Sequence, residues 1–446
     1  MSKIALATLG CKINQYETQV LREYFIQAGF EEVSFREKAD LYIVNTCSVT
    51  QRADQKSEEL IRKAKKNGDL AYLIVTGCYA EAEGNRLKKK FPYIDLIVGN
   101  EEKSNIGQIA LERALKNLFP RQNYSDLSLQ KGSGAIYRTF SSALSIQRFN
   151  GHNRAFVKIE DGCNQFCAYC RIPYVRGDVV RSRSPDEILI EIENLSQNGF
   201  KEIVLAGVNL GLYGRDLNPQ IGLTDLLKKA EYLKEKIRIR LSSLEPHLLS
   251  PELIDLMAES PWICPHLHLP LQSGDEEILE RMERKYTPHQ YKELVRKIRG
   301  KIPSIAITSD VMVGFPGERE SHFNNTYQFL QDLGFSRLHI FRFSPRTGTK
   351  AYSMQPRVDE KTKKRRSKLL RDLAKKLSRD FISQFLGKTL RVLVEDKRDP
   401  ETGLLTGYTD NYIRVLLEGE EELRNKLVRV RLTKVKDGLA MGKVAV

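Results

Sequence analysis

Three cysteines within eight positions restrict the fold of this 446-residue chain more than any other feature: Cys163, Cys167 and Cys170, in the stretch Asp-Gly-Cys-Asn-Gln-Phe-Cys-Ala-Tyr-Cys. Thiolates this close together can surround only one compact metal centre, and iron–sulfur clusters prefer thiolate ligands. A zinc site needs four ligands, usually from paired cysteines, and the ferredoxin run has a fourth cysteine followed by proline. Three ligands on a four-iron cubane leave one iron open to a small molecule. Unliganded buried thiols are the alternative, which explains the clustering poorly because the chain has only seven cysteines.

The spacing C-x3-C-x2-C resembles the signature of the radical S-adenosylmethionine (SAM) enzymes. In that superfamily, the open iron binds the amino and carboxylate groups of SAM. The resemblance implies that these three cysteines hold a [4Fe-4S] cluster that cleaves SAM reductively.

Short apolar runs alternate with amphipathic stretches over the first hundred residues. The pattern predicts strands at 4–9, 41–45, 72–76 and 96–98, and helices at 17–28 and 52–66. Continuous apolar strands separated by helices are typical of a parallel sheet covered on both faces. We therefore predict a small parallel α/β domain at residues 1–120.

The same alternation restarts near residue 155. Strands are predicted at 156–159, 202–206, 237–241, 266–269, 305–313 and 338–343, with helices such as 185–197, 223–233 and 288–298 between them. Six βα units predict a partial (β/α)6 barrel at residues 145–375, with its chemistry at the carboxyl ends of the strands. The Ser-, Asn-, Gly- and Gln-rich region from 100 to 150 is interpreted as the connection.

Strands alone follow, at 389–394, 412–417 and 427–432, with turn signals between them. They predict a small, OB-like β-barrel at residues 380–446, a fold type that often binds nucleic acid. The predicted fold class is therefore α/β multidomain: a parallel sheet domain, a partial barrel and a terminal β-barrel.

Three further cysteines, Cys11, Cys47 and Cys78, each come just after a predicted strand of the first domain. Loops at the carboxyl edge of a parallel sheet converge, so we expect the three thiols around one point. Gly10 and Gly77 allow sharp turns beside a bulky ligand. A second cluster with an open iron is the favoured interpretation, and three separate packing thiols are the alternative. The seventh cysteine, Cys264, is interpreted as a packing residue.

The net charge of +15 and the pI near 9.3 favour a polyanionic partner, although a solvated lysine-rich surface is an alternative. Residues 361–376 contain a single acid and predict a helix with one strongly basic face. No apolar run is long enough to span a bilayer, and the first residues do not match a secretory signal. We expect a cytoplasmic protein without a membrane partner, whose cysteines are reduced.

Longer motifs resemble the radical SAM methylthiotransferases over nearly the whole chain. Thr-Leu-Gly-Cys-Lys-Ile-Asn-Gln-Tyr-Glu-Thr, Val-Asn-Thr-Cys and Val-Thr-Gly-Cys-Tyr-Ala are similar to the first domain of that family. Ser-Ser-Leu-Glu-Pro, His-Leu-Pro-Leu-Gln-Ser-Gly and Gly-Phe-Pro-Gly-Glu are similar to its barrel, and Gly-Tyr-Thr-Asp-Asn-Tyr to its RNA-binding TRAM barrel. The resemblance implies two [4Fe-4S] clusters, with Cys11, Cys47 and Cys78 holding the auxiliary one that carries the inserted sulfur. It also implies SAM as radical source and methyl donor.

The segment from Gly10 to Thr18 resembles the subgroup that modifies C2 of N6-threonylcarbamoyladenosine next to the anticodon. The isopentenyladenosine subgroup usually has Asp-Ser in place of Glu17 and Thr18, and a third group modifies an aspartate of a ribosomal protein. Both remain alternatives, as does an RNA-binding iron–sulfur sensor without catalysis. The implied partners are the anticodon stem-loop of tRNA and an electron donor such as a flavodoxin or ferredoxin. The segment from Arg176 to Arg183 is one residue longer than the family pattern.

Several single residues are candidates for binding, each with a structural alternative. The candidates for SAM contacts lie beside the cysteines or at strand ends: Tyr169, Gly207, Asn209, Gln272 and Ser273. The candidates for RNA contacts lie in the terminal β-barrel: Arg391, Tyr408, Tyr412, Arg414, Arg429, Arg431 and Lys434. Glu245 could meet substrate or a basic partner, and His266 and His268 are predicted to be a core pair.

Overall fold

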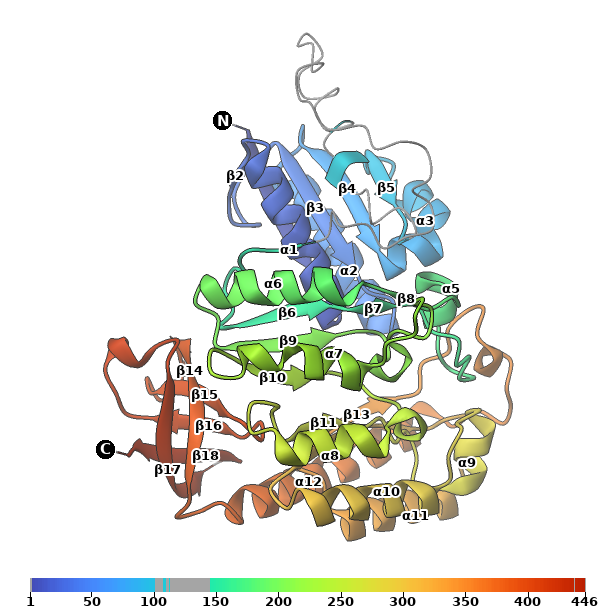
Figure 1. Cartoon of the computed structure of the whole chain (residues 1–446). Helices are drawn as coiled ribbons and strands as arrows, with labels where there is room; N and C mark the ends of the chain where they lie inside the picture. The colour runs from blue at the N-terminus through green and yellow to red at the C-terminus, as the bar shows by residue number, and fades with distance from the viewer. Residues whose placement is uncertain (1, 101–106, 110–111, 113–144, 437, 446) are drawn as a thin grey trace.

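The computed structural model describes residues 2–100, 107–109, 112, 145–436 and 438–445. Figure 1 shows an amino-terminal α/β domain, a central barrel of strands and helices, and a small terminal β-barrel. Most of the predicted connection at 100–150 lies outside the described residues. Within the described ranges, no helix is long and apolar enough to cross a bilayer.

The amino-terminal domain is a parallel five-stranded sheet in the order β2-β1-β3-β4-β5. Its strands and helices are β1 (Lys3–Thr8), β2 (Glu31–Glu32), β3 (Leu41–Thr46), β4 (Tyr72–Gly77), β5 (Leu96–Val98), α1 (Lys12–Gln27), α2 (Gln51–Asn67) and α3 (Cys78–Lys90). Every residue of β3 and β4 is buried, as the continuous apolar runs predict. The predicted start of the first helix at residue 17 is wrong: α1 begins at Lys12, directly after Cys11 in extended conformation. The polar pair Asn14 and Gln15 conceals this first turn from the apolar pattern.

The central domain is the predicted partial (β/α)6 barrel. Two parallel three-stranded sheets are joined by the bridges Ile239–Ile263 and Ser243–His268. The strands, in order, are β6 (Arg154–Lys158), β9 (Glu202–Ala206), β10 (Arg238–Leu241), β11 (His266–His268), β12 (Ala306–Val313) and β13 (Arg337–Arg342). The main helices are α6 (Pro185–Gln197), α7 (Leu223–Lys229), α8 (Pro251–Glu259), α10 (Pro288–Lys301), α11 (Glu320–Leu333) and α12 (Glu360–Ser383), and one continuous apolar core joins them to the strands. The shorter elements are α5 (Ile172–Arg176), α9 (Glu276–Arg281), β7 (Glu160–Asp161) and β8 (Arg181–Ser182).

The terminal domain is a closed β-barrel, in the order β14-β15-β16-β18-β17. Its strands are β14 (Thr389–Arg398), β15 (Leu405–Thr409), β16 (Arg414–Leu417), β17 (Leu427–Lys436) and β18 (Leu439–Val444). The sequence pattern misses β15 and β18, which are short and contain glycine. It also places Tyr412 wrongly in a strand: Tyr412 lies in the turn before β16, with a left-handed φ of 65°.

Both outer domains close the central barrel. The amino-terminal domain contacts both edges of the barrel, because Glu17 of α1 pairs with Arg176 after β6, and Asp54 of α2 pairs with Arg346 after β13. The terminal domain covers the amino-terminal ends of the strands, where Arg240 of β10 donates to the carbonyls of Thr409 and Asp410. The carboxyl ends of the sheet in the first domain therefore face the inside of the second.

Candidate active site

Cys11, Cys47 and Cys78 follow the carboxyl ends of the adjacent parallel strands β1, β3 and β4. The thiols lie close enough for the charges of Cys78 and Cys11 to act on Cys47. Cys11 caps the amino end of α1, and Cys78 is the first residue of α3. Helix amino ends favour negative charge, so this arrangement suits thiolate ligands.

Two glycines are needed for this close approach. Gly77 has a φ of +98°, and a Cβ there would lie 2.3 Å from the carbonyl oxygen of Thr46. Gly10 has a φ of +109°, and a Cβ there would lie 3.1 Å from the sulfur of Cys47. Side chains at either position would push apart the loops that carry the thiols.

The second cysteine triad follows β6 and β7 in one loop that ends at α5. Arg284, which is buried, donates from Nη1 to the sulfur of Cys167 at 3.2 Å and from Nη2 to Glu245 at 2.5 Å. Burial raises the pKa of Cys163 to about 11, as it does for Cys47 in the first triad. Such thiols keep their protons until a metal ion displaces them.

One cavity of about 190 Å³ reaches both triads. Its lining includes Cys78 of the first triad and Cys170 of the second, together with Tyr169, Gln272 and Arg171. The side of the cavity formed by the central barrel comprises Asp310, Met312, Phe341 and Phe343. A molecule held in this cavity would contact metal centres on both triads.

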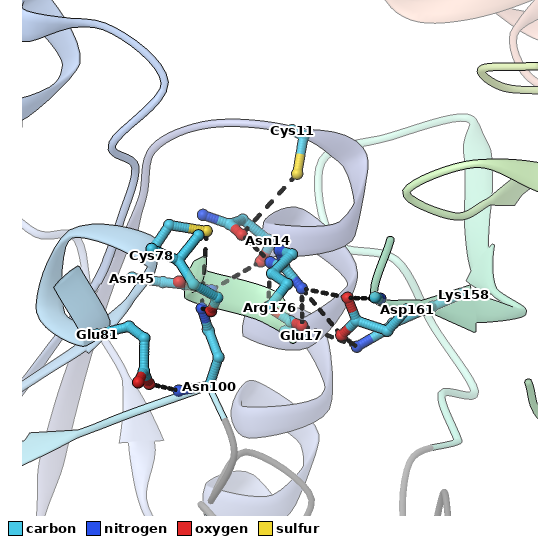
Figure 2. Close-up of polar contacts among 12 residues, drawn as sticks. Cys11, Asn14, Glu17, Asn45, Cys78, Glu81, Asn100, Lys158, Asp161 and Arg176 are labelled. Carbon is cyan, nitrogen blue, oxygen red and sulfur yellow. Dashed lines mark hydrogen bonds and ion pairs between the residues drawn. The ribbon is translucent and has the colours of Figure 1, made fainter. Parts of the chain in front are cut away.

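A buried ion network lies beside the first triad and reaches Asp161, which precedes Cys163 in the chain (Figure 2). Arg176 donates from Nη1 to Glu17 and Asp161, at 3.0 Å each, and from Nη2 to Asn14 at 2.6 Å. Lys158 bridges the same two carboxylates, at 2.9 and 2.6 Å. Burial opposes ionisation of Asp161, but Arg176 and Lys158 outweigh it and lower the pKa to about 2. Two cations therefore balance two anions between the domains.

Asn14 and Asn100 extend this network to the first triad. The side-chain amide of Asn14 donates to the carbonyls of Leu9 and Thr46, in the segments that lead to Cys11 and Cys47. The amide of Asn100 donates to the sulfur of Cys78 at 3.7 Å and to the carbonyl of Val175. No periodic pattern in the sequence indicates these contacts.

Of the five residues predicted to contact SAM, Tyr169 and Gln272 line the cavity. Asn209 accepts from the backbone of Gly211, and its buried amide nitrogen has no partner within the described part of the chain. Gly207 packs against Glu160: a Cβ at position 207 would lie 2.6 Å from Oε2 of Glu160.

Ser273, the fifth candidate, is not brought to the cavity. It is 1% exposed, and its hydroxyl bonds Thr326 and the backbone of Asp275. Glu245 forms an ion pair with Arg284 of the same chain. Cys264 is buried and packs beneath Arg240, as expected for a packing residue.

Three predicted RNA contacts are instead interdomain contacts. Tyr408 and Tyr412 stack on each other with centroids 5.1 Å apart, and Arg154 and Arg240 of the central barrel cover their rings at 4.4 and 4.6 Å. Arg391 pairs with Asp410 and donates to the carbonyl of Pro261. The prediction that the two tyrosines stack on bases is corrected accordingly, because their faces are already covered.

Four predicted RNA residues lie elsewhere on the terminal barrel. Arg414 pairs with Asp399 at 3.2 Å. Arg429, Arg431 and Lys434 project from β17 and are exposed, with backbone spacing that puts the two arginines on one face. These three cationic side chains are therefore accessible to a polyanion.

Comparisons with known proteins cover all three domains. Residues 157–330 match the radical SAM superfamily, residues 3–99 an uncharacterized protein family, UPF0004, and residues 383–445 the TRAM domain. The threonylcarbamoyladenosine tRNA methylthiotransferase MtaB of Bacillus subtilis is 37% identical over 438 residues, which cover 97% of this chain and 94% of the relative. The protein of that name from Aquifex aeolicus is 40% identical, over 96% and 99% of the two chains. A tRNA-2-methylthio-N(6)-dimethylallyladenosine synthase of Natranaerobius thermophilus is 34% identical, over 97% and 94%.

Among solved structures, the radical SAM methyltransferase TsrM of Kitasatospora setae superposes with a TM-score of 0.55 at 16% identity, over 79% of this chain and 77% of the other. At this identity, the likeness supports the fold alone.

Proposed function

The chain belongs to the radical SAM tRNA methylthiotransferase family, and from this premise we propose that it inserts a methylthio group at C2 of N6-threonylcarbamoyladenosine, next to the anticodon of tRNA. The observation that carries the proposal is the single cavity lined by Cys78 of one triad and Cys170 of the other. Methylthiolation needs a radical source and a sulfur source that can both reach one carbon. A cavity between two separate thiol sets provides that arrangement.

The residues present fit two [4Fe-4S] clusters. Each triad supplies three thiols, no fourth cysteine accompanies either triad among the described residues, and one thiol of each triad lines the cavity. We propose Cys163, Cys167 and Cys170 as ligands of the SAM-cleaving cluster, and Cys11, Cys47 and Cys78 as ligands of the auxiliary one. When bound, the first supplies the electron that cleaves SAM, and the second supplies the sulfur.

Side chains of the central barrel would orient SAM and exclude water. Tyr169 forms one wall, and Arg284 fixes it by donating to its hydroxyl at 3.4 Å. The unpartnered amide nitrogen of Asn209 suits the carboxylate of SAM, because a buried donor without a partner is costly. Gln272, in the loop after β11, has a left-handed φ of 68° and lines the cavity.

Positive charge supports tRNA as the partner. The net charge of +15 and the exposed Arg429, Arg431 and Lys434 of the TRAM domain fit a phosphate backbone. The basic helix α12 adds exposed lysines and arginines along its length. A cytoplasmic location and an electron donor of the flavodoxin or ferredoxin class accompany this proposal.

Isopentenyladenosine is the second candidate nucleoside, because relatives named for the dimethylallyl substrate are 33–34% identical. Relatives named for the threonylcarbamoyl substrate reach 37 and 40% identity, which favours threonylcarbamoyladenosine as the nucleoside.

Nucleoside mass spectrometry of tRNA from cells with and without the gene tests the nucleoside. Loss of the 2-methylthio form of threonylcarbamoyladenosine in the deletion, restored by the wild-type gene, is the expected result. An unchanged level would refute the substrate assignment. Iron analysis tests the ligands: alanine at Cys11, Cys47 and Cys78 should lower roughly eight irons per reconstituted chain to roughly four.

A further inference from the structure

A cluster of two histidines and an aspartate lies on the inner wall of the central barrel, apart from both cysteine triads. His268 of β11, Asp310 of β12 and His339 of β13 come from three adjacent strands, and one polar atom of each lies within 4.8 Å of the others. His339 Nδ1 is 3.1 Å from Asp310 Oδ1, and His268 Nε2 is 3.5 Å from Oδ2. The roles proposed above for the clusters and for SAM leave this set unused.

The position of the cluster relates it to the reaction cavity. Asp310 itself lines the cavity, and so do Met312 and Phe341, the next inward-facing residues along β12 and β13. Residues two apart on a strand are separated by about 7 Å. The backbone of His339 therefore lies about 7 Å farther from the carboxyl end of β13 than the backbone of Phe341. A second cavity, of about 240 Å³, begins still deeper, at Thr308 and Arg337.

The cluster is fixed and polar. His268 is held on its other side by Thr308, whose Oγ1 is 3.0 Å from Nδ1. Although burial opposes it, hydrogen bonds from His268 and His339 keep the pKa of Asp310 well below its usual range. The side chain of His339 is 42% exposed, and its Nε2 has no bond to any described residue. Nε2 of His339 is thus the polar atom of the cluster that is left for a ligand within the described part of the chain.

A cation from the facing domain adds to this charge. Lys12, the first residue of α1, forms no ion pair within the described ranges of the chain. Its positive charge acts on His266, a neighbour of the cluster, after burial, Arg240 and His268 in the order of their effects on the pKa of His266, which is held well below normal. Lys12 thus adds a cation near a wall that holds one carboxylate and two histidines.

We propose that His339, held in place by Asp310 and His268 and assisted by Lys12, binds the carboxylate of the threonylcarbamoyl substituent on the target adenosine. In this proposal C2 of the base lies between the triads, and the substituent on N6 extends into the barrel toward His339, two residues before Phe341 on β13. An apolar isopentenyl group would leave the charged wall unpaired, which gives discrimination. This inference rests on the proposed function and specifies how the same site selects its substrate.

Binding measurements on the reconstituted enzyme, without reductant so that no turnover occurs, test the inference. Fluorescence anisotropy compares anticodon stem-loop RNAs that carry threonylcarbamoyladenosine, its carboxyl methyl ester or isopentenyladenosine. Wild type should bind the free acid about tenfold or more tightly than the ester, the range expected for a charge-assisted hydrogen bond. H339L should lose this preference and still bind unmodified RNA like wild type.

H289L is the matched control, because His289 is exposed on α10 and is not part of the cluster; it should keep the full preference. K12M should lose part of the preference for the free acid over the ester. The iron content of this variant verifies that Cys11 still holds metal. Equal binding of acid and ester by wild type, or an unreduced preference in H339L, would overturn the inference. A metal ion that H339L releases while the preference persists would overturn it as well. Failure of wild type to methylthiolate the acid RNA with SAM and reductant would instead refute the proposed function, which separates the two failures.

Discussion

Replacing Gly77 with alanine should damage the auxiliary cluster site far more than the same change in another left-handed glycine. The new Cβ would lie 2.3 Å from Thr46 O, whereas real Cβ contacts stay beyond 3.0 Å, so β4 must move about 0.7 Å from β3. The left-handed backbone costs about 1–2 kcal/mol and the overpacking about 1–3 kcal/mol more. The free energy of unfolding should therefore fall by about 2–5 kcal/mol. Since Cys47 and Cys78 follow these two strands, the thiol geometry is lost with it.

Gly29→Ala is the matched control, because Gly29 has a φ of +89° and a Cβ there meets no atom within 4 Å. It should lose only about 1–2 kcal/mol. Urea unfolding followed by circular dichroism gives both values, and iron analysis after reconstitution gives the cluster content. Gly77→Ala should fall from roughly eight irons toward roughly four, while Gly29→Ala keeps them. Equal stability losses, or full iron content in Gly77→Ala, would refute the steric argument.

Three other substitutions test the buried ion pairs. Arg176→Met removes one of the cations that pair with Glu17 and Asp161 and should cost about 3–5 kcal/mol, whereas Lys65→Met at the exposed pair with Asp69 should leave the free energy of unfolding nearly unchanged. The lowered pKa of Asp161 contributes stability that is present above about pH 4 and lost as the pH falls toward 2. Arg176→Met should therefore move the midpoint of acid unfolding to higher pH. An unchanged midpoint would contradict the role of this pair. Arg284→Met removes the donor to the Cys167 sulfur. In a protein that also lacks Cys11, Cys47 and Cys78, this change should alter the electron paramagnetic resonance spectrum of the remaining reduced cluster. An identical spectrum would show that this contact is unimportant. Arg240→Leu removes donors to two carbonyls of the terminal barrel and should speed proteolysis between the domains, with exposed Arg429→Leu as the silent control; equal cleavage of both would argue against docking through Arg240.

The sequence pattern predicted the position of the thiols well because their placement depends on local features. Cys11, Cys47 and Cys78 each follow an apolar strand, and parallel strands necessarily bring their carboxyl ends to one edge. The six βα units of the central barrel could be counted for the same reason.

Contacts between distant segments were beyond such prediction. Arg176 and Glu17 are 159 residues apart, and Arg346 and Asp54 are 292 apart, so no periodicity relates them. The alternation that identified the terminal strands reports which residues share a face, but not what covers that face. Tyr412 was therefore assigned to RNA although Arg154 and Arg240 cover it.

The terminal β-barrel follows the central domain along the chain, and its turn from Thr409 to Tyr412 covers the amino-terminal ends of the central strands. Without that turn, Arg238, Arg240 and Glu202 would form a charged opening that is accessible to water. The terminal barrel therefore seals the base of the central chamber, and its separation from the central barrel would admit water at the end opposite the cysteine triads.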